Sequence, residues 1–279
     1  MGSTATAEIE RGERFEFGQN WQRYLKILSL DRIAEAEQSL CTMLRVSDLS
    51  GKSFLDIGSG SGLFSLAARR LGARVVSIDY DPLSVACTKE LRQRYLPEDK
   101  DGVWSICVAS VLDEVYLKSL PKFDIVYSWG VLHHTGDLWR ALENASNMVA
   151  GRGTLFISLY NDQGGKSRRW RAVKRTYLHS PSAIRFIMCI VSFVCAYWKG
   201  VVKGMLRGRP LDPFRQYGRG MSAWRDTVDW LGGYPFEVSK PGDVLEFLRK
   251  RGFTLTHLAT TNESGCNEFV FETATDTRA

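Results

Sequence analysis

The sequence lacks the cysteine and histidine patterns of a zinc protein or of a disulfide-stabilised secreted protein. It contains six cysteines and four histidines, with no C-x-x-C pair and no His–Cys cluster at zinc-ligand spacing. We therefore expect free thiols in a reducing compartment and no metal site. The N-terminal residues also lack a charged segment followed by an apolar core, so we expect no signal peptide and a cytoplasmic protein.

The sequence also lacks an uncharged stretch long enough to cross a membrane comfortably. Residues 186–198 carry no charge, but they number only thirteen, whereas a transmembrane helix takes roughly twenty residues. We interpret this stretch as a core helix or a dimer contact. Because Arg185 and Lys199 flank it, a helix that lies in a membrane interface is the alternative.

Acidic residues are scarce in one segment of the chain. Between Asp162 and Gly220, thirteen Lys or Arg residues accompany two Asp residues, a local balance of +11. The whole chain carries +6, which leaves −5 for the remaining residues. The basic character therefore belongs to this segment and needs an explanation of its own.

From residue 53 to residue 161, short apolar runs alternate with helical patterns. The runs predict buried strands at residues 53–57, 75–78, 104–108, 124–128 and 154–159. Helices are predicted between them at residues 63–71, from 82 onward and at 138–149. This alternation predicts an α/β fold with a doubly wound, mostly parallel sheet.

The alternation stops after Tyr160 and resumes near Pro241. A helix at 243–251 and two strands at 253–258 and 267–271 are predicted there, and a helix at 15–44 precedes the first strand. We expect an N-terminal helical segment (1–50), a core (51–161 and 236–272), and a helical insertion (162–235) between the fifth strand and the last strand pair. Residues 1–7 and 273–279 predict frayed tails.

A glycine loop follows the first predicted strand, with the sequence Gly58-Ser-Gly60-Ser-Gly62. Glycines at a strand–helix junction let the backbone approach a ligand closely. A dinucleotide motif reads G-x-G-x-x-G, but here the third glycine comes one residue early and Leu63 stands in its place. The loop therefore disfavours a pyrophosphate and suits a ligand that lies flat across the strand ends.

Two carboxylates flank this loop. Asp79 ends the second predicted strand, twenty-one residues after Gly58, where a carboxylate can accept both hydroxyls of a ribose. Asp56 ends the first strand and is placed for an ammonium group. This combination fits an amino-acid nucleoside better than a dinucleotide.

From Phe54 to Asn161, about 110 residues, the chain resembles the Rossmann-like class I S-adenosylmethionine-dependent methyltransferases. It is especially similar to the small-molecule branch that includes the ubiquinone-biosynthesis O-methyltransferases. Four motifs carry the resemblance in order: the glycine loop, Val76-Ser-Ile-Asp79, the run from Phe123 to His134, and Gly151-Arg-Gly-Thr-Leu-Phe-Ile. Each motif alone is weak, whereas four in order at these spacings are specific.

The resemblance implies a role for each matching position in binding S-adenosyl-L-methionine. Asp56 and the loop would hold the methionine end, Asp79 the ribose, and Tyr80 would lie beside the adenine. The family often has an Asp after the third strand, where this chain has Ser110; adenine recognition is therefore expected from Ser110, the Val111 backbone or Asp113. The cofactor residues expected in this way are Asp56, Gly58, Ser59, Gly60, Gly62, Asp79, Tyr80, Ser110 and Val111, with Trp129 and Gly130 as the floor of the site.

Candidate catalytic and acceptor residues follow the fourth and fifth strands. His133 and His134 could include a general base, because imidazole titrates near neutrality; alternatively they orient the next helix. Tyr160 and Asn161 are expected to face the acceptor. Residues 15–21, ahead of the core, are interpreted either as a lid over the cofactor or as ordinary helix packing.

The basic insertion is interpreted as a cap that recognises an anionic or lipid-linked acceptor. Arg168, Arg171 and Arg175 share one face of a predicted helix, and arginine suits forked recognition of phosphate or carboxylate. Trp224 and Arg225 belong to an aromatic, turn-rich part that predicts a pocket wall. A solvated basic face is the alternative explanation.

We therefore expect a methyltransferase that acts on a small-molecule, glycan or lipid-linked acceptor, with oxygen as the methylated atom. Peripheral membrane contact and a homodimer are alternatives left open for the insertion. A nucleic-acid methyltransferase is a competing interpretation, because the insertion could bind phosphates. Against it, the fourth strand ends in Ser-Trp-Gly rather than the Asn/Asp-Pro-Pro-aromatic motif of base N-methylation. A non-catalytic cofactor-binding protein is the third interpretation.

Overall fold

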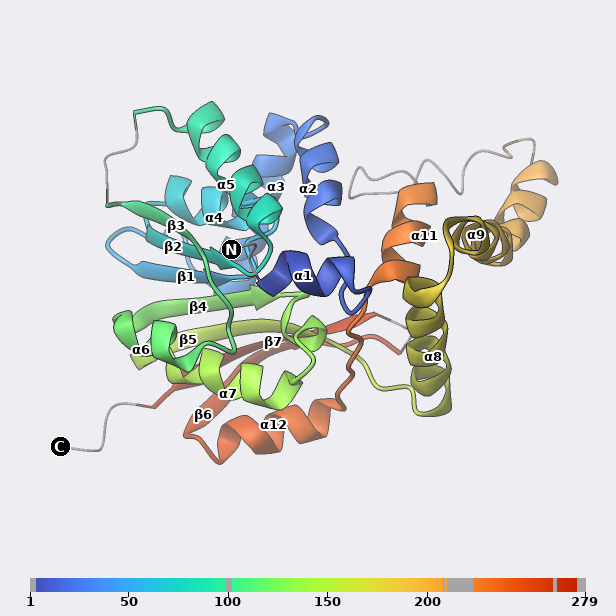
Figure 1. Ribbon diagram of the computed structural model, residues 1–279. Coiled ribbons are helices and arrows are strands. Elements are labelled where there is room, and N and C mark those ends of the chain that lie inside the picture. The colour runs from blue at the N-terminus through green and yellow to red at the C-terminus, as the bar shows by residue number, and fades with distance from the viewer. Residues whose placement is uncertain (1–3, 99–101, 208, 210–222, 263–264, 275–279) are drawn as a thin grey trace.

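The computed structural model describes residues 4–98, 102–207, 209, 223–262 and 265–274, and it contains a seven-stranded sheet (Figure 1). The strands are β1 (Ser53–Ile57), β2 (Arg74–Asp79), β3 (Trp104–Val108), β4 (Phe123–Trp129), β5 (Val149–Tyr160), β6 (Phe253–Ala259) and β7 (Cys266–Thr273). Their order in the sheet is β3-β2-β1-β4-β5-β7-β6. β1 to β5 are parallel, and β7 runs antiparallel to β5 and β6. The predicted doubly wound, mostly parallel sheet is confirmed.

Helices cover both faces of this sheet, as Figure 1 shows. One face packs on α3 (Leu30–Leu44), α4 (Leu63–Arg70) and α5 (Pro82–Tyr95). The other face packs on α6 (Glu114–Ser119), α7 (Leu138–Asn147) and α12 (Pro241–Arg249). Two apolar cores result, one in each layer, and the sheet between them positions the loops at its carboxyl edge.

The N-terminal region differs from the sequence prediction in two ways. Residues 4–7, predicted as part of a frayed tail, belong to helix α1 (Thr4–Glu10). The single helix predicted over residues 15–44 is instead two helices, α2 (Phe17–Leu25) and α3. The chain changes direction at Ser29, which has extended backbone angles, so that α2 packs on α5 while α3 packs on α4. The periodicity of apolar residues in the sequence does not show where a helix ends and the next one packs on a different partner.

The insertion lies beyond the carboxyl end of β5 (Figure 1). Its described helices are α8 (Gly165–His179), α9 (Ser182–Met205) and α11 (Ala223–Gly232). The interpretation of residues 186–198 as a core helix is wrong, because Cys189 and Gly204 are the only buried residues of α9. This helix of 24 residues is also long and apolar enough to cross a membrane by length and composition.

Candidate functional site

The glycine loop after β1 is tight enough to require glycine at three positions. Gly58, Gly60 and Gly62 have φ angles of 79°, 56° and 82°, which disfavour any side chain. A Cβ atom at Gly58 would come within 2.4 Å of the Val131 side chain, and one at Gly60 within 2.8 Å of the Trp21 ring. The loop therefore brings its backbone close to the segments around it, and its close approach to a ligand stays a prediction.

Asp79 holds the glycine loop from the end of β2. One carboxylate oxygen accepts the backbone N–H of Gly60, and the other accepts that of Asp81, each at 2.9 Å. Burial raises the pKa of Asp79 to about 6, although these two hydrogen bonds oppose the shift. Asp81 caps α5 by accepting the backbone N–H of Leu83.

Asp56 lies at the end of a chain of buried hydrogen bonds that crosses β3, β2 and α4. The Trp104 indole donates to Ser77 at 2.8 Å, Ser77 and Ser65 share a hydrogen bond at 2.6 Å, and Ser65 donates to Asp56. All four side chains are buried. Burial raises the pKa of Asp56 to about 7, because a buried carboxylate charge is costly without a cationic partner. The hydrogen bond from Ser65 partly opposes this shift and holds the carboxyl in place.

The loop and the two carboxyls fit the cofactor that the resemblance implies. Asp56, which is buried, and Asp79, which is half-buried, are acceptors at the carboxyl ends of adjacent strands, where an ammonium group and ribose hydroxyls would find partners. At the third strand, the Ser110 hydroxyl accepts the Leu112 N–H at 3.1 Å, and the Val111 carbonyl accepts the Asn144 amide at 2.9 Å. Both residues lie where adenine contacts were predicted, and their role in binding stays a prediction.

The N-terminal segment folds over this region. The Gly18 N–H donates to Asp81 at 2.8 Å, and Trp21 lies against Gly60. The guanidinium of Arg14 lies 4.8 Å from the centroid of the Tyr80 ring, and the Tyr80 hydroxyl donates to Glu8. The segment predicted as a lid or as ordinary packing, residues 15–21, thus contacts the glycine loop and the cap of α5, and Arg14 and Glu8 ahead of it contact Tyr80.

Trp129 and Gly130, predicted as the floor of the cofactor site, end β4. The Trp129 indole donates to Glu268 on β7 at 3.0 Å, so its polar edge points across β5 rather than toward β1. Gly130 has a φ angle of 74°, and its N–H donates to the Ser158 carbonyl. Val131, the next residue, contacts Gly58 instead.

The two histidines lie in a short 3₁₀ turn, η1 (Leu132–His134), and both are buried. His133 accepts the Tyr160 N–H on Nδ1 at 3.3 Å, and its ring lies 3.8 Å from the Tyr160 ring. His134 donates from Nδ1 to the Pro235 carbonyl at 2.6 Å, which leaves its Nε2 as an acceptor. Burial lowers the pKa of His134 to about 3 and that of His133 well below its ordinary value, so both rings are neutral at neutral pH.

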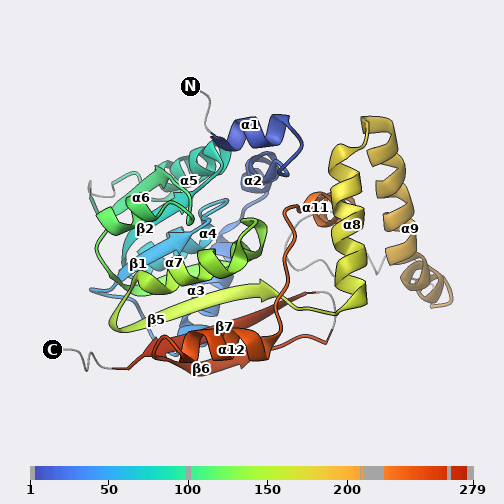
Figure 2. The same cartoon turned by 60° about the horizontal axis from the view of Figure 1, so that its bottom comes forward.

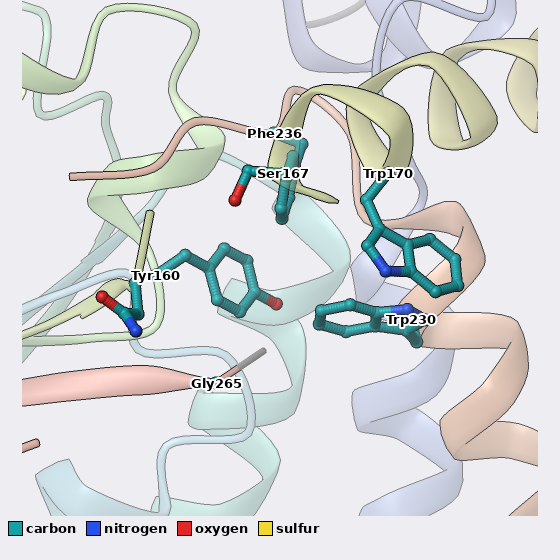
Figure 3. A pocket seen from close by; sticks show the side chains of 7 residues that line it. Tyr160, Ser167, Trp170, Trp230, Phe236 and Gly265 are labelled. Carbon is teal, nitrogen blue, oxygen red and sulfur yellow. The ribbon is translucent and has the colours of Figure 1, made fainter. Parts of the chain in front are cut away.

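A small aromatic recess, with room for about one water molecule, lies at the carboxyl edge of the sheet (Figure 3), and both histidine rings contact its Tyr160 wall. Its walls are Tyr160 and Asn161 after β5, Trp170 from α8, Trp230 from α11, and Phe236. The Tyr160 ring lies 5.8 Å from Trp230 and 5.2 Å from Phe236. The remaining lining residues are Ser167 and Gly265. Tyr160 and Asn161, predicted to face the acceptor, thus line a concave, largely apolar site.

A buried lysine supports this recess from α8. Lys174 is fully buried, lies 4.2 Å from the Trp230 ring centroid and 4.9 Å from that of Phe236, and donates to the Trp230 carbonyl. Burial lowers the pKa of Lys174 to about 7. Lys174, which the sequence analysis counted only in the charge of the insertion, is therefore buried behind the Trp230 and Phe236 side chains of the recess.

The arginines predicted to bind the acceptor are not gathered in the recess. Arg171 donates from Nε to the Phe236 carbonyl at 3.1 Å, and Arg168 is exposed. Trp224 packs on Phe186 and belongs to the contact between α11 and α9. The side chain of Arg225 lies outside the described residues.

Sequence reasoning missed four members of the site: Lys174, Trp170, Trp230 and Phe236. A signal for the first two existed, because Ser167, Trp170, Lys174 and Tyr177 follow one another at three- and four-residue spacing on a single helix face. Residues at this spacing share one face of a helix, so Lys174 lies on the buried face of α8 together with Ser167 and Tyr177. In the described part of the chain, no group of three or more His, Cys, Asp or Glu side chains could hold a metal ion.

Comparison with known proteins adds the family. A family model described as a methyltransferase domain matches residues 31–187. A ribosomal protein L11 methyltransferase of Thermosipho africanus is 38% identical over 87 residues, which cover 26% of this chain and 34% of that protein. The match thus spans about a third of the length of that relative.

Two solved structures have the same fold. The magnesium protoporphyrin IX methyltransferase of Synechocystis PCC 6803 with bound SAH has a TM-score of 0.53 and 14% identity, covering 87% of this chain and 83% of its own. An O-methyltransferase family protein of Burkholderia thailandensis has a TM-score of 0.53 and 9% identity, covering 88% and 57%. At these identities the likeness concerns the fold. None of these three proteins is named as a ubiquinone-biosynthesis enzyme, so that finer resemblance stays a prediction.

Proposed function

Because the chain belongs to the class I S-adenosylmethionine-dependent methyltransferases, we propose that it methylates a small-molecule, glycan or lipid-linked acceptor at an oxygen atom. The family model matches more than half of the chain and includes the glycine loop, both flanking carboxyls and the histidine turn. The acceptor class rests on the aromatic recess, which is the observation that carries the proposal.

The residues of the glycine loop and its two carboxyls are assigned to the cofactor. Asp56, held by Ser65, would bind the amino-acid end, and Asp79 would bind the ribose while it keeps Gly60 in place. Tyr80 would lie beside the adenine, under the Arg14 guanidinium. When bound, S-adenosylmethionine supplies a methyl group on a sulfonium, which an oxygen nucleophile takes up by in-line displacement.

The recess residues are assigned to positioning the acceptor. In-line displacement depends mainly on alignment and on the exclusion of water, and the rings of Tyr160, Trp230 and Phe236 would provide both for a planar or apolar acceptor that widens the recess. The recess is too apolar to favour a phosphate backbone, because none of its described lining residues is charged. This favours a small acceptor over a nucleic acid.

We assign to His134 the role of accepting the proton of the acceptor hydroxyl. Its Nδ1 donates to Pro235, and this fixes a neutral tautomer whose Nε2 can accept a proton. A pKa near 3 makes His134 a weak base. It therefore assists proton departure as the methyl group transfers rather than forming an alkoxide beforehand.

The experiment is methyl-label transfer from S-adenosylmethionine to a panel of phenols, sugars, lipid extracts and RNA, with wild type and two variants. Trp230→Ala opens the recess, and Trp139→Ala removes a tryptophan from α7 that contacts Phe247 instead. We expect label in a small-molecule or lipid fraction, at least about tenfold less of it in Trp230→Ala, and no change in Trp139→Ala. Calorimetry with S-adenosylhomocysteine should give the same affinity for all three proteins. Label found only in RNA would refute the acceptor assignment, and no cofactor binding by wild type would refute the reaction itself.

A further inference from the structure

Helix α9 exposes an apolar stripe along its whole length. Seven apolar side chains recur at spacings of three or four residues, and each is 47–63% exposed: Ile184, Ile187, Val191, Val194, Trp198, Val202 and Met205. In a globular domain such a stripe is the face that a helix buries. Here the stripe faces outward, which marks it as a surface that binds something.

The opposite face of α9 already has its partners within the chain. Cys189 is buried against Tyr177 of α8, and Phe193 packs on Trp224 of α11 with ring centroids 5.6 Å apart. These contacts hold α9 on the insertion by one face. The exposed stripe is therefore not a helix surface left over from poor packing, because the helix has a second apolar face for its own domain.

The charged residues of α8 and α9 all have one sign. From Gln163 to Leu211 the sequence has eleven Lys or Arg residues and no Asp or Glu. Lys199 and Lys203 are exposed near the C-terminal end of α9, beside the stripe, and Arg207 is exposed just after the helix. A second copy of the chain would bring the same positive charge to the contact, whereas a surface of anionic lipid headgroups complements it.

The position of α8 determines how the helix can meet a bilayer. Figure 2 shows α8 and α9 side by side at the outer end of the insertion, and the exposed residues of α8 include Arg168, Arg169 and Arg175. These guanidiniums cannot follow α9 into hydrocarbon at acceptable cost. A helix of 24 residues, about 36 Å long, can instead lie along the interface with its stripe down and its cations among the headgroups.

We propose that α9 docks this protein on the surface of an anionic lipid bilayer, with the stripe from Ile184 to Met205 in the interface and the lysines beside it on the headgroups. The docking does not depend on the methyl-transfer reaction. It places the insertion, and with it the aromatic recess formed by α8 and α11, next to the membrane.

The first test is sedimentation of the full chain with vesicles of phosphatidylglycerol or phosphatidylcholine. Val191→Asp/Val194→Asp should lower binding to phosphatidylglycerol vesicles by at least about tenfold, because two apolar anchors are lost and negative charge is added. Lys199→Glu/Lys203→Glu should lower binding to the same vesicles and weaken its dependence on salt. Val115→Asp, a substitution of an 83%-exposed valine on α6, is the matched control and should bind like wild type.

Further measurements distinguish docking on a bilayer surface from self-association through the stripe and from a membrane-crossing helix. Equal melting temperatures would show that each variant is folded. Wild type that does not bind phosphatidylglycerol vesicles, but sediments as a dimer that Val191→Asp/Val194→Asp converts to a monomer, would overturn the proposal in favour of self-association. Bound protein that resists extraction by alkaline carbonate would overturn the interfacial placement in favour of a membrane-crossing helix. Release by carbonate supports docking at the surface.

Discussion

Replacing Lys174 by methionine should change how the stability of this protein depends on pH. The ammonium group is fully buried between the Trp230 and Phe236 rings, and the Trp230 carbonyl accepts its hydrogen bond. Burial lowers the pKa from 10.5 to about 7. Methionine has a similar length and no charge, so it removes the titration while largely filling the same space.

The size of the effect follows from the two pKa values. Below about pH 7 both folded and unfolded chains hold the Lys174 proton, and the folded state carries the full cost of the buried charge. Between about pH 7 and about pH 10 the unfolded chain holds the proton and the folded chain does not, so stability rises with pH. At up to about 1.4 kcal/mol per pH unit, Lys174 makes the protein about 2 kcal/mol more stable at pH 9 than at pH 7.

The assay is urea unfolding of wild type and Lys174→Met at about pH 7 and about pH 9. Asp56 and Asp79 have raised pKa values and act in the opposite direction, since their contribution to stability falls as pH rises through about 6 to 7. Subtracting the change in unfolding free energy of Lys174→Met from that of wild type removes the contribution that both proteins share. We expect wild type to gain about 2 kcal/mol more than the variant on going to the higher pH, and Lys166→Met, an exposed position on the same helix, to behave like wild type. Equal gains in Lys174→Met and wild type would refute a lysine that loses its proton on folding.

Three other outcomes are expected. Asp79→Ala should lose most affinity for S-adenosylhomocysteine in calorimetry, because its hydrogen bonds to the loop are lost; in wild type that affinity should fall as pH falls below about 6, where the carboxyl is protonated. His134→Ala should lower the maximal rate by roughly a hundredfold with cofactor affinity intact; a loss of only a few-fold would mean that alignment alone drives the reaction. Joint replacement of Arg168, Arg171 and Arg175 by glutamine should leave cofactor affinity unchanged and lower acceptor turnover or vesicle binding; wild-type values in all three assays would mean a solvated basic face.

The sheet was predictable because its signals are local. Each predicted strand of the core lies within an observed strand, since a buried parallel strand is an apolar run that needs no distant information. β5 begins earlier than predicted, at Val149, because Arg152 adopts a left-handed conformation and the strand continues past an irregularity. The glycine loop and Asp79 were predictable for the same reason, since their spacing reflects a single strand–turn–helix unit.

Beyond Tyr160 and Asn161, the acceptor side was not predictable, because its parts come together only in the folded chain. Tyr160, Trp170, Trp230 and Phe236 come from segments up to 76 positions apart in the sequence, and no pattern joins them. Lys174 was counted as surface charge because a lysine is rarely buried. α1 was missed because a helix of seven residues has little intrinsic stability and depends on contacts such as Glu8 with Tyr80.

The N-terminal segment has a consequence for the order in which ligands enter and leave. Arg14 contacts the Tyr80 ring on the cofactor side and donates to the His134 carbonyl on the acceptor side, while Phe15 donates its N–H to the Tyr234 carbonyl. The segment therefore cannot move away from the glycine loop without breaking its hydrogen bonds to the histidine turn and to Tyr234, which lies two residues before the recess residue Phe236. Exchange of the cofactor then disturbs the binding site of the acceptor, and the reverse also holds. We therefore expect a kinetic mechanism in which the two ligands bind in a fixed order rather than at random. Product-inhibition patterns in wild type and in Arg14→Ala would distinguish the two.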